Sequence, residues 1–429
     1  MMPPEGQPEV DAVDPLTLEN YIPYAPLDTY KPYYTNAADP EYLRHVAQIG
    51  QWLHTADGRA FVREARGVQR EAEVVRRRDD ARSGRYVTQK KLSPLLRERM
   101  RRCRHTRFRD KDIAVVVSTE GEASWRGIMS CNCRSCIHCG TRLAQRDAEL
   151  IEALVQVHGY QRTAMATFTI RHWQRCKIER LRKGLVLSFR RMMQHREWRE
   201  HPALGKVDMV RALEVTLMGE HGPHPHLHVL LLLEAAEVGD AELAALQSFL
   251  AELWRDTVDR VMGRAFRPTL EHGVDVTRCR RADYLSKLGF EVTDAAHVKR
   301  SHNVTGKSYW QVVEEWDGQD VDDPQALAIR EYIEGMHGAK IVTWSRALKK
   351  RAEKILDKPK PEERERASLF PEEWDQFRNL CTDEGVDARA AVLTVAEHAP
   401  VGQVDAHVRA FVEKLLIARR RPRGPPKRI

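Results

Sequence analysis

The stretch HPHLHVLLLL, residues 224–233, decides the fold of the central part of this chain. Its apolar character predicts a buried β-strand that carries two imidazoles, His226 and His228. Side chains alternate between the two faces of a strand, so the two imidazoles point the same way, whereas Leu227 and Val229 point into the packed side. Two imidazoles on one face of an apolar strand indicate a metal site.

The segments around this strand predict an α+β fold. A turn-rich sequence at 220–223 joins the strand to an earlier one at 208–218, which favours an antiparallel hairpin. Further strands are expected at 163–170 and 274–277, and helices at 181–193, 239–262 and 281–288. This order of elements predicts an antiparallel sheet with helices packed mainly on one face.

A third metal ligand is expected on the earlier strand of the hairpin. If the hairpin turns near 220–222, Glu214 lies opposite His228. One carboxylate and two imidazoles leave open positions on a divalent ion, which can then polarise a phosphodiester oxygen. His221 and His224 are weaker candidates, and the alternative is that the histidines belong to the core.

A tyrosine and a lysine follow the histidine strand after one further helix and strand. In Tyr284-Leu285-Ser286-Lys287 the spacing i, i+3 places both side chains on one helix face. A phenol titrates near 10, so it becomes a nucleophile only when a cation or a base favours its phenolate; Lys287, the metal and Asp283 are candidates for that role. The spacing alone is common in helices, and its interest comes from its position after the histidine strand.

A cluster of cysteines predicts a second metal site. Four of the eight cysteines fall within nine residues: Cys131, Cys133, Cys136 and Cys139. Such crowding favours Zn²⁺ bound by four thiolates over disulfides. The two-residue gap makes Cys136 and Cys139 the stronger pair. The one-residue gap between the other two is tight, so Cys103, His105 or His138 are possible replacements; free thiols and an iron–sulfur cluster are the alternatives.

Composition and charge predict a soluble chain with a polyanionic partner. The 429 residues are 42% hydrophobic and 31% charged, and they contain no run long and apolar enough for a membrane span and no signal peptide, so a cytoplasmic location is expected. The net charge is +8, with basic clusters at 90–112 and 419–428. Clustered cations suit nucleic-acid phosphates, although a solvated basic face has the same composition.

Three motifs together resemble those of the HUH endonucleases: Thr167-Phe168-Thr169, His226-x-His228 and Tyr284-x-x-Lys287. The segments Cys136-x-x-Cys139, GPHPHLHVL at 222–230 and TWSRAL at 343–348 are similar to those of bacterial rolling-circle plasmid replication initiators. The resemblance covers about residues 125–350. It implies a palm-like nuclease domain that acts on single-stranded or extruded plasmid origin DNA.

The resemblance also implies residue roles. His226 and His228 would bind Mg²⁺ or Mn²⁺, Tyr284 would attack the scissile phosphate, and Lys287 would orient the metal or the phosphate. The products would be a 5′-phosphotyrosine and a free 3′-hydroxyl that primes synthesis. Related proteins often carry an acidic residue one turn before the tyrosine, where this chain has Arg280; Asp283 and Glu291 are the nearby acids, so the terminating cleavage lacks an assigned base.

The resemblance and the composition divide the chain into segments. They are an extended arm (1–40), a basic helical region (41–110), a zinc module (111–145), an HUH-type endonuclease domain (146–316), a helical extension (317–356), a linker with a small helical unit (357–418) and a basic tail (419–429). Gly306-Lys307-Ser308 lacks the first glycine of a phosphate-binding loop, because Ser301 stands in its place. A separate host helicase is therefore expected.

Two other functions fit the same sequence. One is a zinc-bearing DNA-binding regulator without catalytic activity, in which the histidine strand is part of the core. The other is an HUH relaxase or transposase, which would use the same chemistry for conjugation or transposition.

Overall fold

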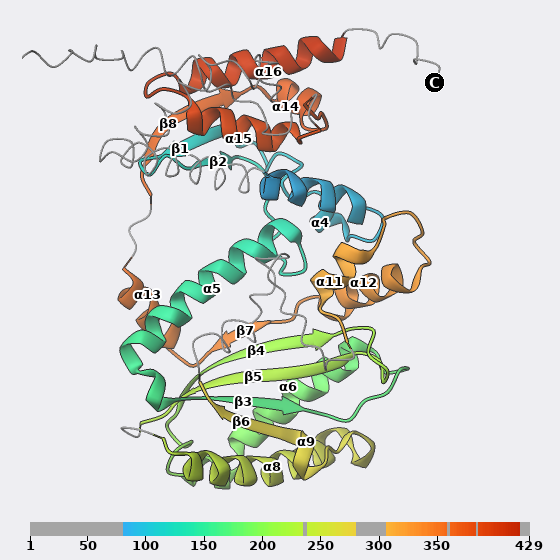
Figure 1. Ribbon diagram of the computed structural model, residues 1–429, viewed down its shortest axis with the longest axis vertical. Coiled ribbons are helices and arrows are strands. Elements are labelled where there is room, and N and C mark those ends of the chain that lie inside the picture. Colours follow the sequence, from blue (N-terminus) through green and yellow to red (C-terminus); the bar gives the residue numbers. More distant parts are fainter. Residues whose placement is uncertain (1–79, 235–237, 280–305, 358–360, 383–384, 421–429) are drawn as a thin grey trace, which may run out of the picture. The chain divides into compact units, whose positions relative to one another are not determined.

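The computed structural model describes residues 80–420, except 235–237, 280–305, 358–360 and 383–384 (Figure 1). All of them belong to one compact unit, Arg77–Ile429. These described residues form an α+β fold with two antiparallel sheets, one of five strands and one of three. Within the described residues no helix is long and apolar enough to cross a membrane.

The five-stranded sheet has the histidine strand at its centre. Its strands follow the order β6 (Val274–Arg278), β3 (Thr163–Thr169), β5 (His224–Leu232), β4 (Asp208–Thr216) and β7 (Val342–Trp344). Each neighbouring pair is antiparallel. The strands expected from the sequence and the β4–β5 hairpin are confirmed. Strand β5 lies in the middle because its run from Leu227 to Leu232 is buried throughout.

Helices cover both faces of this sheet. On one face α6 (Ile178–Gln194) and α8 (Asp240–Met262) pack on Leu227, Val229 and Leu231. On the other face α5 (Ile137–His158) and α13 (Leu348–Leu356) pack on Leu230 and Leu232 (Figure 1). The prediction that helices lie mainly on one face is therefore wrong. A strand that is apolar at successive positions is one that is buried on both faces, and β5 has this pattern beyond His228.

Aromatic packing holds α6 and α8 against the end of β3. The ring of Phe168 meets Phe189 at 5.1 Å and Trp254 at 5.2 Å, both edge to face. The Trp254 indole N–H donates to the carbonyl of Thr169 at 2.7 Å. Buried edge-to-face pairs contribute about 0.5–1.5 kcal/mol each beyond the burial of their area. They fix the position at which β3 ends and the following loop begins.

A second, smaller sheet has its own core. It has the order β2 (Ala123–Arg126), β1 (Ile113–Ser118) and β8 (Glu363–Leu369). Helices α14 (Pro371–Phe377), α15 (Ala388–His398) and α16 (Val404–Arg420) pack on it. The sequence placed 111–145 and 357–418 in separate segments, but β1 and β8 pair directly, from Ile113 with Leu369 onward. Strand β8 was taken for a linker because four of its seven residues are charged.

Shorter elements connect these parts. They are a helix at 80–92, α4 (Glu98–Arg101), η2 (Tyr160–Arg162), α7 (Arg196–Glu200), η3 (Arg264–Phe266), α9 (Leu270–Gly273), α11 (Tyr309–Glu315) and α12 (Pro324–Gly335). Helix α12 packs against α6 and α11 packs against α12, and both helices join the larger core through buried residues such as Val312 and Ile329.

Candidate functional site

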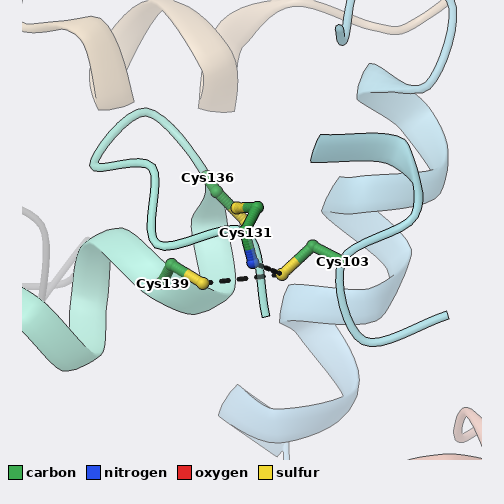
Figure 2. Close-up of side chains that lie close together, drawn as sticks. All are labelled: Cys103, Cys131, Cys136 and Cys139. Carbon is green, nitrogen blue, oxygen red and sulfur yellow. Dashed lines mark hydrogen bonds between the residues drawn. The ribbon is translucent and has the colours of Figure 1, made fainter. Parts of the chain in front are cut away.

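Four buried cysteines meet beside the N-terminus of α5 (Figure 2). They are Cys103, Cys131, Cys136 and Cys139, and their sulfur atoms all lie within 4.8 Å of one another. The sulfurs of Cys103 and Cys139 are 3.5 Å apart. Tetrahedral zinc with Zn–S bonds of about 2.3 Å requires sulfurs about 3.8 Å apart. The group can therefore hold a metal such as zinc.

The local chain geometry explains why these sulfurs converge. Cys136 is the N-cap residue of α5 and Cys139 lies in its first turn, so both face the same end of the helix. The preceding loop turns back closely enough that a Cβ at Gly140 would lie 2.3 Å from the carbonyl oxygen of Arg134. Only glycine fits at this position. The backbone N–H of Cys131 donates to the sulfur of Cys103 at 3.4 Å, which holds Cys103 beside the other three cysteines.

The thiols differ in acidity because they share hydrogen bonds. Hydrogen bonds from neighbouring thiols lower the pKa of Cys103 and of Cys139. The pKa of Cys131 rises to about 12, chiefly through its hydrogen bond with Cys103. A lowered pKa favours the thiolate, the form that binds metal.

The ligand set differs from the first choice made from the sequence. Cys103 joins the group, whereas Cys133 lies outside it, half-buried, with its sulfur 3.6 Å from the carbonyl oxygen of Cys131. His105 and His138 are not members either. The tight one-residue gap before Cys133 was the signal for a replacement. The spacing of the cysteines in the sequence could not identify Cys103 as a ligand, because strands β1 and β2 lie between it and the other three cysteines.

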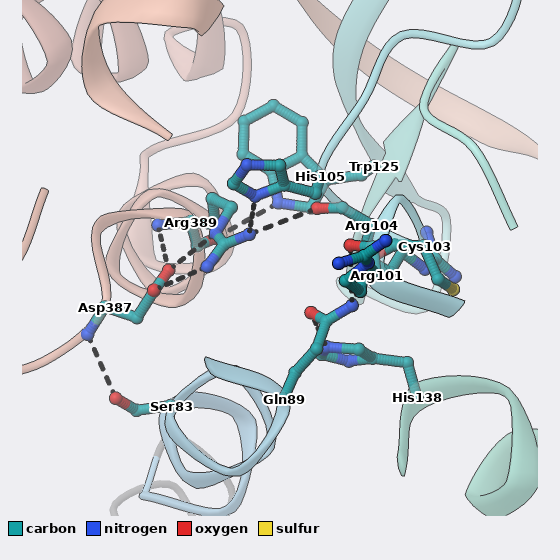
Figure 3. Close-up of polar contacts among 10 residues, drawn as sticks. All are labelled: Ser83, Gln89, Arg101, Cys103, Arg104, His105, Trp125, His138, Asp387 and Arg389. Atoms are coloured by element: carbon teal, nitrogen blue, oxygen red, sulfur yellow. Dashed lines mark hydrogen bonds and ion pairs between the residues drawn. The ribbon is translucent and has the colours of Figure 1, made fainter. Parts of the chain in front are cut away.

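A buried amide supports both sides of the cysteine group (Figure 3). The Gln89 side-chain N–H₂ donates to the carbonyl of Cys103 at 2.6 Å. It also donates to the carbonyl of Met100 at 3.1 Å. Its amide oxygen lies 3.1 Å from Nε2 of His138, which stands between Cys136 and Cys139. Burial holds the pKa of His138 well below its usual value, so the ring is neutral and can donate this hydrogen bond. Gln89 thus ties the segment of Cys103 to the first turn of α5.

An arginine network continues from this support to α15 (Figure 3). Arg389 is buried and pairs with both carboxylate oxygens of Asp387, at 2.8 and 2.9 Å. It also donates to the carbonyl of Arg104 at 3.3 Å. Its guanidinium lies 4.0 Å from the ring centre of Tyr86. These contacts join the residues next to Cys103 to the core of the smaller sheet.

The histidine strand forms the second candidate site. His226 and His228 lie on one face of β5, as predicted, with their rings stacked at 5.7 Å. The register of the hairpin differs from the prediction, since Glu214 lies opposite His226 and Ala212 lies opposite His228. The Glu214 carboxylate still reaches Nε2 of His228, at 2.7 Å, because a diagonal neighbour on the same face is within range. The two imidazoles and the carboxylate therefore share one face.

Burial sets the charge of this face. It lowers the pKa of His226 to about 3 and that of His224 to about 4, so both rings are neutral near pH 7. Burial raises the pKa of Glu214, but the hydrogen bond from His228 opposes this effect, and the pKa lies below its usual value. Neutral imidazoles and an ionised carboxylate are the forms that bind a divalent ion.

The donor atoms on this face hold hydrogen bonds within the protein. Nδ1 of His228 lies 3.1 Å from the Thr167 hydroxyl, and Nε2 of His226 lies 3.3 Å from the Thr216 hydroxyl. In the part of the chain that the structure describes, only the cysteine group brings three or more such ligand atoms within 4.8 Å. An ion bound here would require the Glu214 carboxylate to exchange His228 for the metal. The face therefore has the correct residue types without a preformed ion cage.

Two further histidines extend the row. The ring of His224 lies 4.3 Å from that of His226, and the ring of His172, from the loop after β3, lies 4.4 Å from that of His224. Nδ1 of His172 also lies 3.1 Å from the carbonyl oxygen of His221, whose own side chain is exposed. We call His172, His224, His226 and His228 the histidine row. His172 could not be predicted from the sequence, because its loop has no periodic pattern.

A tyrosine from α12 lies near the same face. Burial and the charge of Glu214 raise the pKa of Tyr332, whose ring stacks on Tyr309 at 4.3 Å. The Tyr309 hydroxyl donates to the carbonyl of Ser135, next to Cys136. The stacked pair of Tyr309 and Tyr332 thus contacts the backbone beside Cys136 and lies within the electrostatic influence of Glu214. The predicted catalytic residues Asp283, Tyr284 and Lys287, and their neighbours Arg280 and Glu291, lie outside the described residues.

Comparison with known protein families, with curated proteins and with solved structures finds no match to this chain.

Proposed function

We propose that this protein is a metal-dependent endonuclease that nicks single-stranded plasmid origin DNA to initiate rolling-circle replication. The observation that carries the proposal is the central strand β5, which presents His226 and His228 with Glu214 on one face of an antiparallel sheet. The motif resemblance adds Tyr284 as the nucleophile and Lys287 as its cationic neighbour. A bound Mg²⁺ or Mn²⁺ would polarise the scissile phosphate.

The proposed reaction is a transesterification. The Tyr284 oxygen bonds to phosphorus and the bond from phosphorus to the 3′ oxygen breaks. The phenolic proton passes to a base such as Asp283, and the departing 3′ oxygen takes up a proton from water, so that the proton count balances once the base releases its proton. The products are a 5′-phosphotyrosine and a 3′-hydroxyl from which a polymerase extends. Since water does not attack the phosphorus, the energy of the phosphodiester bond is conserved in the phosphotyrosine for the later rejoining step. A host helicase would open the duplex ahead of the polymerase.

The test is the formation of a covalent protein–DNA adduct. The full chain is incubated with tiled single strands of the DNA that flanks its own gene, with Mg²⁺ or Mn²⁺, and the adduct is resolved by denaturing electrophoresis. Tyr284→Phe should abolish the adduct, and so should the double change His226→Ala with His228→Ala. Tyr332→Phe is the matched control, because this phenol lies near Glu214 but is not the proposed nucleophile. An adduct that survives Tyr284→Phe and disappears with Tyr332→Phe refutes the assignment.

A zinc-bearing DNA-binding regulator is the second candidate function. The observation that favours it is that the cysteine group is preformed, whereas the donors of the histidine strand are hydrogen-bonded within the protein. In that case origin DNA binds, and no adduct forms on any tile with either metal. A relaxase or transposase would form the same adduct, but on a transfer origin or a transposon end.

A further inference from the structure

An open hollow lined by arginines lies at the end of β3. Its volume is about 520 Å³, and four of its eight lining residues are arginines: Arg171, Arg255, Arg264 and Arg267. The other four are Pro268, Thr269, Leu270 and Glu271. We call this the arginine hollow. It belongs neither to the cysteine group nor to the face of His226 and His228.

The positive charge of the hollow exceeds its negative charge. Arg267 pairs with Asp259 at 3.2 Å, and Glu271 is the one acidic residue of the lining. Among the described residues, no ion pair joins Arg171, Arg255 or Arg264 to a carboxylate. Arg171 and Arg264 are exposed. Guanidinium groups gathered in this way are well suited to the oxygens of phosphate groups, which they bind in bidentate fashion.

The backbone around the hollow is held in place. The N–H of Arg171 donates to the carbonyl of Phe266 at 3.0 Å, which joins the loop after β3 to the turn that carries Arg264 and Arg267. The guanidinium of Arg180 covers the ring of Phe266 at 5.0 Å. The arginines therefore project from two segments that are fixed to each other.

The loop after β3 connects the hollow to the histidine row. Thr169 lies opposite His226, and Arg171 follows two residues later, about 7 Å along an extended chain. The next residue, His172, belongs to the histidine row. Trp173 follows, 42% exposed, with its ring 4.8 Å from that of Phe266. One short loop thus presents a phosphate ligand, an imidazole and an exposed indole in succession.

We infer that the arginine hollow binds phosphates of a single-stranded DNA whose neighbouring nucleotides lie over the histidine row, with Trp173 as a stacking platform for one base. The inference rests on the proposed function, because it places the strand that the histidine face would cleave. A single strand suits this surface better than a duplex, since a duplex keeps its base faces stacked and cannot offer one to Trp173. An anionic membrane would engage the arginines alone.

The first experiment measures the salt dependence of DNA binding. A labelled 20-nucleotide single strand is titrated with the full chain by fluorescence anisotropy, without added Mg²⁺ or Mn²⁺, so that binding is separated from cleavage. Arg171→Gln with Arg264→Gln should reduce the slope of log affinity against log salt by about 1.4, since each phosphate contact to a single strand contributes about 0.7. At 0.1 M salt this corresponds to a loss of about 25-fold. Arg190→Gln with Arg191→Gln, two exposed arginines of α6, is the control with equal charge loss.

The second experiment tests the stacking platform. Trp173→Ala should weaken single-strand binding about tenfold and Trp173→Phe should restore most of it, whereas duplex binding should not change with either variant. The inference is overturned if the α6 control loses as much affinity as the hollow variant. It is also overturned if the hollow variant loses affinity only for phosphatidylglycerol vesicles. If these binding results appear and no adduct forms, the proposed nicking fails while the strand-binding inference stands.

Discussion

The identity of the zinc ligands can be tested by comparing Cys103→Ser with Cys133→Ser. Structural zinc contributes about 10–16 kcal/mol of folding free energy in small zinc domains, so an equal share for each of four ligands is about 2.5–4 kcal/mol. Cys103 is fully buried, and its sulfur lies 3.5 Å from that of Cys139. Cys103→Ser should therefore lower the free energy of unfolding by at least about 2.5 kcal/mol. Cys133 is half-buried and its sulfur bonds only weakly to Cys131, so Cys133→Ser, which keeps a hydrogen-bonding group there, should change the free energy of unfolding by less than about 0.5 kcal/mol.

The measurements are the zinc content per chain and the free energy of unfolding in urea. Wild type and Cys133→Ser should retain about one zinc ion per chain, whereas Cys103→Ser should release it to a weak chelator. The double variant Cys103→Ser with Cys133→Ser should resemble Cys103→Ser alone. The reasoning is refuted if Cys133→Ser loses zinc while Cys103→Ser retains it, or if wild-type protein purified with zinc in every buffer contains none.

Three further predictions concern the support of the two sites. Gln89→Leu should weaken zinc binding by about 10-fold to 100-fold in a chelator competition, because it removes the hydrogen bonds that connect the Cys103 backbone to His138. Gln156→Leu, on the exposed side of α5, is the control and should have no effect. Gly222→Ala should lower the free energy of unfolding by more than Gly338→Ala does. Both glycines have positive φ, but only at Gly222 would a Cβ meet backbone, 2.6 Å from Cα of Gln174; equal losses contradict this reasoning. Burial lowers the pKa of His158 below its unfolded value of about 6.5. As the pH falls through that value the unfolded chain takes up the proton first, so the free energy of unfolding decreases. His158→Asn should flatten this pH dependence between about pH 7.5 and 5 in urea unfolding, and an unchanged slope contradicts the prediction.

The sequence predicted four strands of the five-stranded sheet because their signal is local. The fifth strand, β7, lies in the segment 317–356, which was expected to be helical, because three residues are too few to show a strand pattern. An unbroken apolar run with same-face histidines is typical of a central strand, and β5 is one. The helices on the second face were not predicted, because α5 and α13 meet β5 only through contacts between residues far apart in the chain. The pairing of β1 with β8 was missed for the same reason, since about 250 residues separate Ile113 from Leu369.

The ligands across the hairpin show which errors in register a site tolerates. The prediction placed Glu214 opposite His228, whereas the structure places it opposite His226, a difference of two residues. The loop between the strands sets the register, and its residues Met218 and Gly222 have positive φ, which the sequence does not reveal for Met218. A shift of one residue would have moved Glu214 to the face of Leu227 and removed it from the histidines. A shift of two residues leaves Glu214 on the same sheet face as the histidines. Alternation along a strand therefore predicts which residues share a site, even where it does not predict which of them are directly opposite each other.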